Sequence, residues 1–300
     1  MLILSRLAPL KNAKNEDEIM RIGLESSAYF GLYDYEEGLK KLKAHGYSCI
    51  DYGELSDRSS ELYQFSEDKY RGFLMDIGES ARKLDVEITQ LHALWPTDDR
   101  TKEQREESVS YFIKEIEGAH YLGCKNVVVH PFMPFGWYDG KDKEKIWETN
   151  VDLFTRLVEH AEKYNVNVCV ENLPFDLIEM SRVKEVKRLV RAINHPNLKI
   201  CLDTGHANVF RDDIAEDVRL LGDDLAALHV HDNKGNWDQH LIPYMGNIKW
   251  EEFLASLKEI GYKGAFTLET MISPKMPQPI KEEMQMSLAK LAKQMGEKIV

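Results

Sequence analysis

Metal-binding residue types end a series of apolar, strand-like segments in this 300-residue sequence. Six successive segments run through apolar residues and then reach a histidine or an acid. These residues are His92, His130, Glu171, Asp203, His229 with His231, and Glu269. One such residue at the end of a strand usually meets solvent or a backbone group, but the repetition indicates a shared site.

Four of these residues have the donor types for one divalent ion: Glu171, Asp203, His229 and Glu269. Three carboxylates that converge on one place repel one another, and without compensation at least one of them holds its proton at neutral pH. A divalent cation removes this conflict. Three oxygen donors and one imidazole suit Mn²⁺, our first choice, or Mg²⁺, with Co²⁺ and Zn²⁺ as alternatives.

Alternating strand-like and helix-like segments must position these residues. The predicted strands cover residues 22–31, 47–52, 86–94, 126–130, 166–171, 198–203, 225–231 and 264–269. The predicted helices cover residues 35–45, 67–84, 105–122, 145–164, 184–193, 214–221, 250–260 and 283–295. Strands that are apolar throughout are typical of parallel strands with helices on both faces. We therefore predict an α/β fold, a (β/α)₈ TIM barrel forming a single domain over residues 1–300, with an open doubly wound sheet as the alternative.

Further polar and aromatic residues lie in the segments after these strands, which line the active site in a barrel. Asp203 and His206 flank a tight turn, and Asp238 and His240 occupy a long loop after the seventh strand. The residues expected to bind substrate or additional metal are His92, His130, His206, His231, Asp238 and His240. Aromatic side chains on the loops are expected to form an apolar wall that excludes water and stacks on a sugar. This substrate wall comprises Trp95, Trp137 and Trp237.

Composition narrows the classes of partner. The 39 Lys and Arg residues against 51 Asp and Glu give a formal net charge of −12, which disfavours nucleic acids and anionic membranes. No apolar run approaches the ~18 residues of a membrane span, and residues 1–12 contain no apolar stretch of signal-peptide length. The four cysteines form no CxxC pair and are expected to be buried free thiols. We therefore expect a cytoplasmic protein. Homo-oligomers are common for this kind of fold, but no residue in the sequence specifies one.

Four motifs carry a resemblance to a known superfamily: VENLP at 170–174, CLDTGHAN at 201–208, LHVHDN with DQHL between 228 and 241, and LET at 268–270. Together they resemble the xylose isomerase-like TIM barrels, which include sugar isomerases and epimerases, and the resemblance spans almost the whole chain. In the ketose 3-epimerases of this group, one metal is bound by residues that correspond to Glu171, Asp203, His229 and Glu269. The resemblance implies that Glu171 and Glu269 remove and return a proton while the metal stabilises an enediolate, and that His206 hydrogen-bonds the substrate.

Endonuclease IV resembles this chain in a larger set of residues. Its three-zinc site corresponds to His92, His130, Glu171, Asp203, His206, His229, Asp238, His240 and Glu269. The acidic composition favours a carbohydrate instead. So does the stretch HLIPYMGNIKW, which resembles HLPPGEGxIDW of sugar isomerase-like members, although Tyr244 and Met245 replace the usual Gly and Glu.

We therefore expect a metal-dependent isomerase or epimerase of a sugar or sugar phosphate, a small-molecule carbohydrate substrate. The alternatives are a lyase of the same superfamily, either inosose dehydratase-like or C-glycoside-cleaving, an endonuclease IV-like phosphodiesterase, and a non-enzymatic sugar-binding protein.

Overall fold

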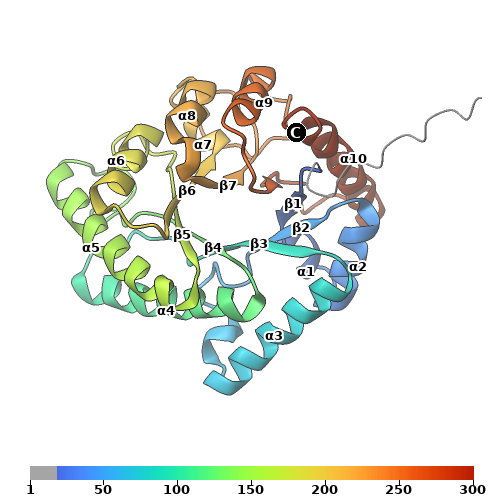
Figure 1. Ribbon diagram of the computed structural model, residues 1–300, viewed down its shortest axis with the longest axis horizontal. Helices are drawn as coiled ribbons and strands as arrows, with labels where there is room; N and C mark the ends of the chain where they lie inside the picture. The colour runs from blue at the N-terminus through green and yellow to red at the C-terminus, as the bar shows by residue number, and fades with distance from the viewer. Residues whose placement is uncertain (1–18) are drawn as a thin grey trace, which may run out of the picture.

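Eight parallel strands form the centre of the computed structural model, which describes residues 19–300 (Figure 1). The strands are β1 (Ile22–Glu25), β2 (Cys49–Tyr52), β3 (Glu87–His92), β4 (Asn126–Val129), β5 (Asn167–Glu171), β6 (Leu198–Asp203), β7 (Leu225–His229) and β8 (Phe266–Leu268). They pair in the order β7-β6-β5-β4-β3-β2-β1-β8. The ring closes because Val230, just after β7, forms a parallel bridge with Leu268 of β8. The predicted barrel is therefore confirmed, and an open sheet is excluded.

Helices follow the strands and surround the ring (Figure 1). They are α1 (Ser27–Phe30), α2 (Tyr35–His45), α3 (Glu67–Lys83), α4 (Lys102–Leu122), α5 (Lys143–Ala161), α6 (Val183–Ile193), α7 (Thr204–Val209), α8 (Ile214–Leu221), α9 (Trp250–Glu259) and α10 (Gln278–Gly296). Short 3₁₀ turns cover Glu61–Gln64, Glu162–Tyr164 and Gly222–Asp224. Gly46 and Gly123 end α2 and α4 with φ of 106° and 78°. Glycine reaches this left-handed conformation without steric cost, as the sequence pattern predicts.

The first predicted strand is wrong in its second half. Only Ile22–Glu25 pairs with the neighbouring strands, and the helical turn α1 occupies residues 27–30. The turn begins where the Ser26 amide donates to the Asp51 carbonyl at 2.8 Å and the Phe30 amide donates back to Ser26. The turn buries Tyr29 to 2% exposure. The apolar run therefore reflects packing of a turn rather than a longer strand.

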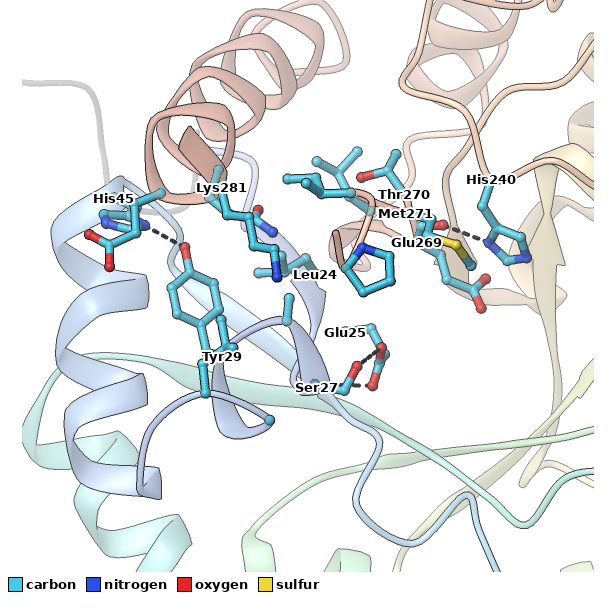
Figure 2. A pocket seen from close by; sticks show the side chains of 18 of the residues that line it. Leu24, Glu25, Ser27, Tyr29, His45, His240, Glu269, Thr270, Met271 and Lys281 are labelled. Atoms are coloured by element: carbon cyan, nitrogen blue, oxygen red, sulfur yellow. Dashed lines mark hydrogen bonds between the residues drawn. The ribbon is translucent and has the colours of Figure 1, made fainter. Parts of the chain in front are cut away.

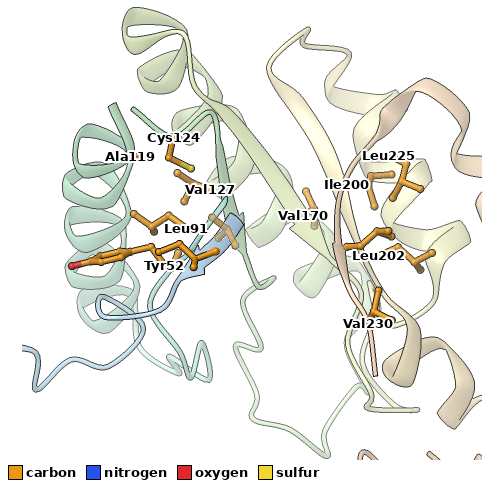
Figure 3. Close-up of a cluster of buried hydrophobic side chains, with 14 of the residues drawn as sticks. Tyr52, Leu91, Ala119, Cys124, Val127, Val170, Ile200, Leu202, Leu225 and Val230 are labelled. Carbon is orange, nitrogen blue, oxygen red and sulfur yellow. The ribbon is translucent and has the colours of Figure 1, made fainter. Parts of the chain in front are cut away.

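The alternation of side chains along the strands places the polar residues inside the ring. Strand residues alternate between the two faces, so positions two apart share a face. Val127 and Val129 belong to the large cluster packed against the helices, part of which appears in Figure 3. A separate small cluster contains Val128, Cys169, Cys201 and Ala227. Moving two residues on from the last three of these reaches Glu171, Asp203 and His229, which form the next layer toward the barrel mouth.

The structure also bears on the expectations about the cysteines and about membrane-spanning segments. All four cysteines are buried and free. No helix within residues 19–300 has the length and apolar character to cross a membrane. The expectation about a signal peptide concerns residues 1–12, which lie outside the described residues.

Candidate active site

The carboxyl ends of three adjacent strands supply the centre of the site. Glu171 ends β5, Asp203 ends β6, and His229 ends β7, and Glu269 follows β8. The strand register sets Asp203 beside His229. The first three side chains are buried, whereas the Glu269 side chain is 22% exposed. Parallel strands bring their carboxyl ends to one rim, so residues nearly 100 positions apart meet there.

Glu171 and His229 form the middle of this cluster. Glu171 Oε1 lies 3.0 Å from His229 Nδ1, and the same nitrogen lies 3.3 Å from Glu269 Oε2. Glu171 Oε2 lies 2.8 Å from Nε2 of His130, at the end of β4. His92 stands farther away, with its Nε2 3.8 Å from Glu171 Oε2, and its ring stacks on that of His229. Four strands and the segment after β8 thus contribute to one group.

A second group surrounds Asp203. Its Oδ2 lies 2.9 Å from His231 Nε2, and its Oδ1 accepts a hydrogen bond of 2.6 Å from the His206 amide. Asp238 approaches from the loop after β7, with its Oδ2 2.9 Å from His240 Nε2 and 3.4 Å from His206 Nε2. The structure therefore gathers all six residues expected to contact substrate or additional metal around the two groups.

Buried Asp232 holds the loop that carries Asp238 and His240. Its carboxylate accepts hydrogen bonds from the amides of Gly246, Asn247 and Ile248 and from the Trp250 indole, at 2.9–3.2 Å. One buried acid therefore ties the far end of the loop to the end of β7.

Backbone carbonyls orient three of the histidines. The Nδ1 atom of each lies 2.8 Å from a carbonyl oxygen: His92 with Ala93, His206 with Asn172, and His240 with Glu269. A carbonyl only accepts, so Nδ1 carries the proton and Nε2 of the neutral ring presents a lone pair. For His206 and His240 that lone pair faces Asp238. A lone pair facing a carboxylate needs a cation, either a proton or a metal ion.

Several buried polar atoms support a cation at this centre. Glu171 Oε2, Glu269 Oε2 and Asp238 Oδ1 are buried and accept no hydrogen bond among residues 19–300, although imidazole nitrogens lie 2.8 Å from the first and 3.3 Å from the second. A buried carboxylate oxygen without a partner costs free energy. Groups of three possible ligands with mutually close donor atoms include His92, His130 and Glu171, and also Asp203, His206 and His231. The donor chemistry of the site therefore fits a divalent metal ion.

Burial and neighbouring charges shift the carboxyl pKa values of the centre in opposite directions. Burial alone would raise the pKa of the Glu171 carboxyl, but His229 and the other adjacent imidazoles hold that pKa well below its ordinary value. Burial would also raise the pKa of Asp203, whereas the neighbouring imidazoles lower it to about 2. Burial raises the pKa of Glu269. The carboxylates therefore depend on nearby positive charge, which a divalent cation also supplies.

Asp51 is a buried residue of this site that the sequence analysis missed. It lies in β2, and its Oδ2 is 2.9 Å from His229 Nε2 and accepts a 3.0 Å hydrogen bond from Gln90. Its other oxygen is buried without a partner among the described residues. The available signal was an acid within the apolar segment CIDY. Tyr52 follows it in the strand, so Asp51 does not mark the end of the apolar segment.

The three tryptophans expected to form a wall separate in the structure. Trp95 lies 4.3 Å from His130 between ring centroids and stacks on Trp137 at 5.8 Å. Trp137 in turn stacks on Phe175. Trp237 is 61% exposed and has no aromatic contact within residues 19–300. The structure therefore brings Trp95 and Trp137 together beside the centre and leaves Trp237 out, because the Trp237 side chain faces solvent while Asp238 and His240 of the same loop reach the site.

Two cavities open beside Glu269. One, of about 470 Å³, extends between α1, the segment after β8 and the start of α10 (Figure 2). The other, of about 560 Å³, extends past His92 and Trp95. Both are lined by Glu25, Ser27 and Glu269. These volumes lie in the range of small-ligand sites, roughly 300–1,000 Å³.

Comparison with known proteins gives one family and several relatives. The family model described as xylose isomerase-like TIM barrel matches residues 39–291. The chain is 29% identical to D-psicose 3-epimerase of Ruminiclostridium cellulolyticum over 145 residues, 48% of each protein. The chain spans about half the length of the first curated relatives that it matches.

Solved structures share the fold over nearly the whole chain. A D-psicose 3-epimerase structure determined with D-fructose superimposes with a TM-score of 0.75 at 17% identity, covering 91% of this chain and 98% of that one. The IolI protein with a bound zinc atom superimposes with a TM-score of 0.72 at 22% identity, covering 91% and 96%.

Proposed function

The chain belongs to the xylose isomerase-like TIM barrel family, and from this premise we propose that it is a divalent-metal-dependent isomerase or epimerase of a small sugar. The observation that carries the proposal is the approach of two glutamates to one imidazole nitrogen. Glu171 and Glu269 lie 3.0 and 3.3 Å from His229 Nδ1. The similarity to a D-psicose 3-epimerase supports the same reaction class.

Four residues of this chain would hold the metal ion: Glu171, Asp203, His229 and Glu269. Their three carboxylates and one imidazole suit Mn²⁺ first, with Zn²⁺, Co²⁺ and Mg²⁺ as alternatives. A bound divalent ion would supply a Lewis acid that stabilises negative charge on substrate oxygens. The zinc atom of the IolI structure supports a metal requirement in this family.

Proton transfer beside a carbonyl is the step that the two glutamates would carry out. One carboxylate takes the proton from the substrate carbon, and the electron pair of that bond moves toward the carbonyl oxygen. The other glutamate starts protonated and gives its proton to carbon. Exchange of both carboxyl groups with solvent then restores their protonation states for the next turnover. Positioned proton transfer of this kind contributes about 10²–10⁴ in rate.

Other side chains of the site would position the reacting groups. Asp51 accepts a hydrogen bond from His229 Nε2, so the lone pair of that ring is at Nδ1, where it would bind the metal ion. His206 presents Nε2 toward Asp238 at the edge of the centre, where it would meet a substrate hydroxyl. Trp95 and Trp137 provide an apolar wall that would exclude water and stack on the sugar.

The test is exchange of a substrate proton with solvent. Protein loaded with Mn²⁺ is incubated in D₂O with a panel of ketoses and keto acids, and deuterium at the carbon beside the carbonyl is followed by NMR and mass spectrometry. Deuterium incorporation with product of unchanged carbon skeleton is expected, and Glu269→Gln should slow it by about 10²–10⁴. Loss of water from the substrate would identify a lyase instead. Absence of exchange with every ketose and keto acid would refute the proposal.

Cleavage of phosphodiesters is a second candidate because of the group around Asp203. Asp203 has four further possible metal ligands around it, enough for additional metal ions: His206, His231, Asp238 and His240. A phosphodiesterase that uses several metal ions needs additional ligands of this kind. Incubation of the Zn²⁺-loaded protein with an abasic DNA duplex at low salt tests it. Strand cleavage would support this function, and absence of both binding and cleavage would eliminate it.

A further inference from the structure

The cavity of about 470 Å³ beside Glu269 contains a lysine that nothing in the proposed chemistry uses. Lys281 lies in the first turn of α10 and extends into the space between Tyr29 and Glu269 (Figure 2). Its ammonium group has no hydrogen-bond or ion-pair partner among residues 19–300. Lys41, by contrast, pairs with Glu282 at 3.3 Å. Lys281 is therefore the cation of this cavity whose charge is not compensated.

The stability of α10 does not explain this lysine. The positive end of the helix dipole lies at the first turn, so a cation there is unfavourable by about 0.3–1 kcal/mol. The first turn also contains no acidic residue that would offset the charge. A lysine held in this position is suited to an anion that arrives from outside the chain.

Three carboxylates line the cavity: Glu269 belongs to the proposed metal centre, and Glu25 and Glu282 already have donors. Glu25 accepts hydrogen bonds from the amide and the hydroxyl of Ser27. Glu282 accepts from the hydroxyl of Tyr33 and from Lys41. Neither Glu25 nor Glu282 forms an ion pair with Lys281.

The cavity on the other side of Glu269 has no lysine or arginine in its lining. Its lining includes Glu54, Asp57 and Glu61. Like charges repel, so an anionic group on a ligand would avoid that side. A ligand that spans both cavities would therefore direct its anionic end toward Lys281.

We propose that this cavity binds the anionic terminal group, phosphate or carboxylate, of a sugar whose reacting carbon lies at Glu269, and that Lys281 determines this specificity. The inference rests on the proposed function, because Glu269 is both a proposed proton carrier and part of the cavity wall. The cavity then distinguishes an acid-bearing sugar from the neutral sugar of the same stereochemistry.

The experiment compares matched pairs of ketoses with Mn²⁺-loaded protein. The pairs are ribulose with ribulose 5-phosphate, fructose with fructose 6-phosphate, and each free sugar with its terminal carboxylate. We expect kcat/KM to favour at least one anionic class, and Lys281→Ala to lower kcat/KM for that class by about tenfold to hundredfold, as loss of a hydrogen bond to a charged group does. The neutral sugars should change less than about twofold by the same reasoning, because they place no charge at Lys281. Comparison of the phosphate and carboxylate pairs identifies the group.

Two variants control for effects of charge and folding. Lys281→Arg should retain most of the preference, because it keeps the cation. Lys275→Ala removes an exposed lysine of the neighbouring segment, outside the cavity lining, and should change nothing. Equal kcat/KM for anionic and neutral sugars in the wild type, or an unchanged preference in Lys281→Ala, would overturn the proposal.

Binding separates this inference from the proposed function. Calorimetry with the same sugar pairs measures affinity whether or not turnover occurs. If no ketose reacts but an anionic sugar binds more tightly and Lys281→Ala removes the difference, the anion site stands and the isomerase proposal fails. If anionic and neutral sugars bind equally in the wild type and in Lys281→Ala, the anion site is refuted.

Discussion

Replacement of Asp51 by asparagine tests how the site positions a metal ligand. The two side chains have the same size, but asparagine removes the buried charge that lies 2.9 Å from His229 Nε2. Because Oδ2 also accepts a hydrogen bond from Gln90, the amide oxygen of asparagine would take its place. This neutral acceptor holds the Nε2 proton less strongly, so Nδ1, which faces Glu171 and Glu269, becomes a weaker metal ligand. The variant should therefore weaken metal binding while the fold persists.

The magnitude follows from burial and charge. Asp51 and His229 are both fully buried, so solvent does not screen their hydrogen bond. Hydrogen bonds to charged groups contribute about 1.5–3 kcal/mol, which corresponds to roughly a tenfold to hundredfold change in affinity. Loss of an outer-shell partner of a metal-binding histidine has the same range, about 10–100-fold.

The assay is a metal titration. Protein stripped with a chelator is titrated with Mn²⁺ and Zn²⁺ against a fluorescent chelator, which gives Kd without any substrate. Glu115→Gln is the matched control, because Glu115 is an equally buried carboxylate on α4 that donates nothing to the centre. The reasoning is refuted if Asp51→Asn binds both metals as tightly as the wild type.

Three further outcomes are expected. Glu269→Gln should lower the rate of deuterium exchange into substrate by about 10²–10⁴ with unchanged thermal unfolding of the metal-free protein; an exchange rate within threefold of wild type would exclude Glu269 as a proton carrier. Removal of metal should lower the midpoint of thermal unfolding, and Mn²⁺ at 100 times its Kd should restore about 2.7 kcal/mol of stability; calorimetry that shows no metal dependence would argue against a bound ion. Burial raises the pKa of Glu115 in the folded protein to about 8. Between the ordinary carboxyl pKa of the unfolded chain and pH 8, the folded state keeps a proton that the unfolded state has lost. The free energy of unfolding therefore falls as pH rises through this range. Urea unfolding should show the stability difference between wild type and Glu115→Gln declining between about pH 6 and 8.5 by up to a few kcal/mol, and a constant difference would contradict this assignment.

The sequence predicted the barrel because parallel strands and their helices leave strong local patterns. In β5 and β6, three apolar residues, VCV and ICL, lead to a single acid, Glu171 or Asp203, and this break in the pattern marks both the end of the strand and the rim. Once eight such units close a ring, their carboxyl ends meet. The candidate ligands could therefore be named from the order of residue types alone.

Local pattern failed where packing between distant elements decides the outcome. The turn at Ser27–Phe30 looks like a strand in sequence, but Tyr29 is buried there against the ring of His45. Asp51 has the sequence context of a strand interior, and its role follows from His229, 178 residues away.

The sequence by itself determined the fold and which residue types reach the rim, because periodicity and strand ends are properties of neighbouring residues. Only the tertiary structure decided which atoms face one another. It brought Asp51 to the back of His229, turned Trp237 into solvent, and directed Lys281 from the last helix into a cavity that begins at β1. Contacts of this kind depend on side-chain orientation across the closed ring, which no local stretch of sequence encodes.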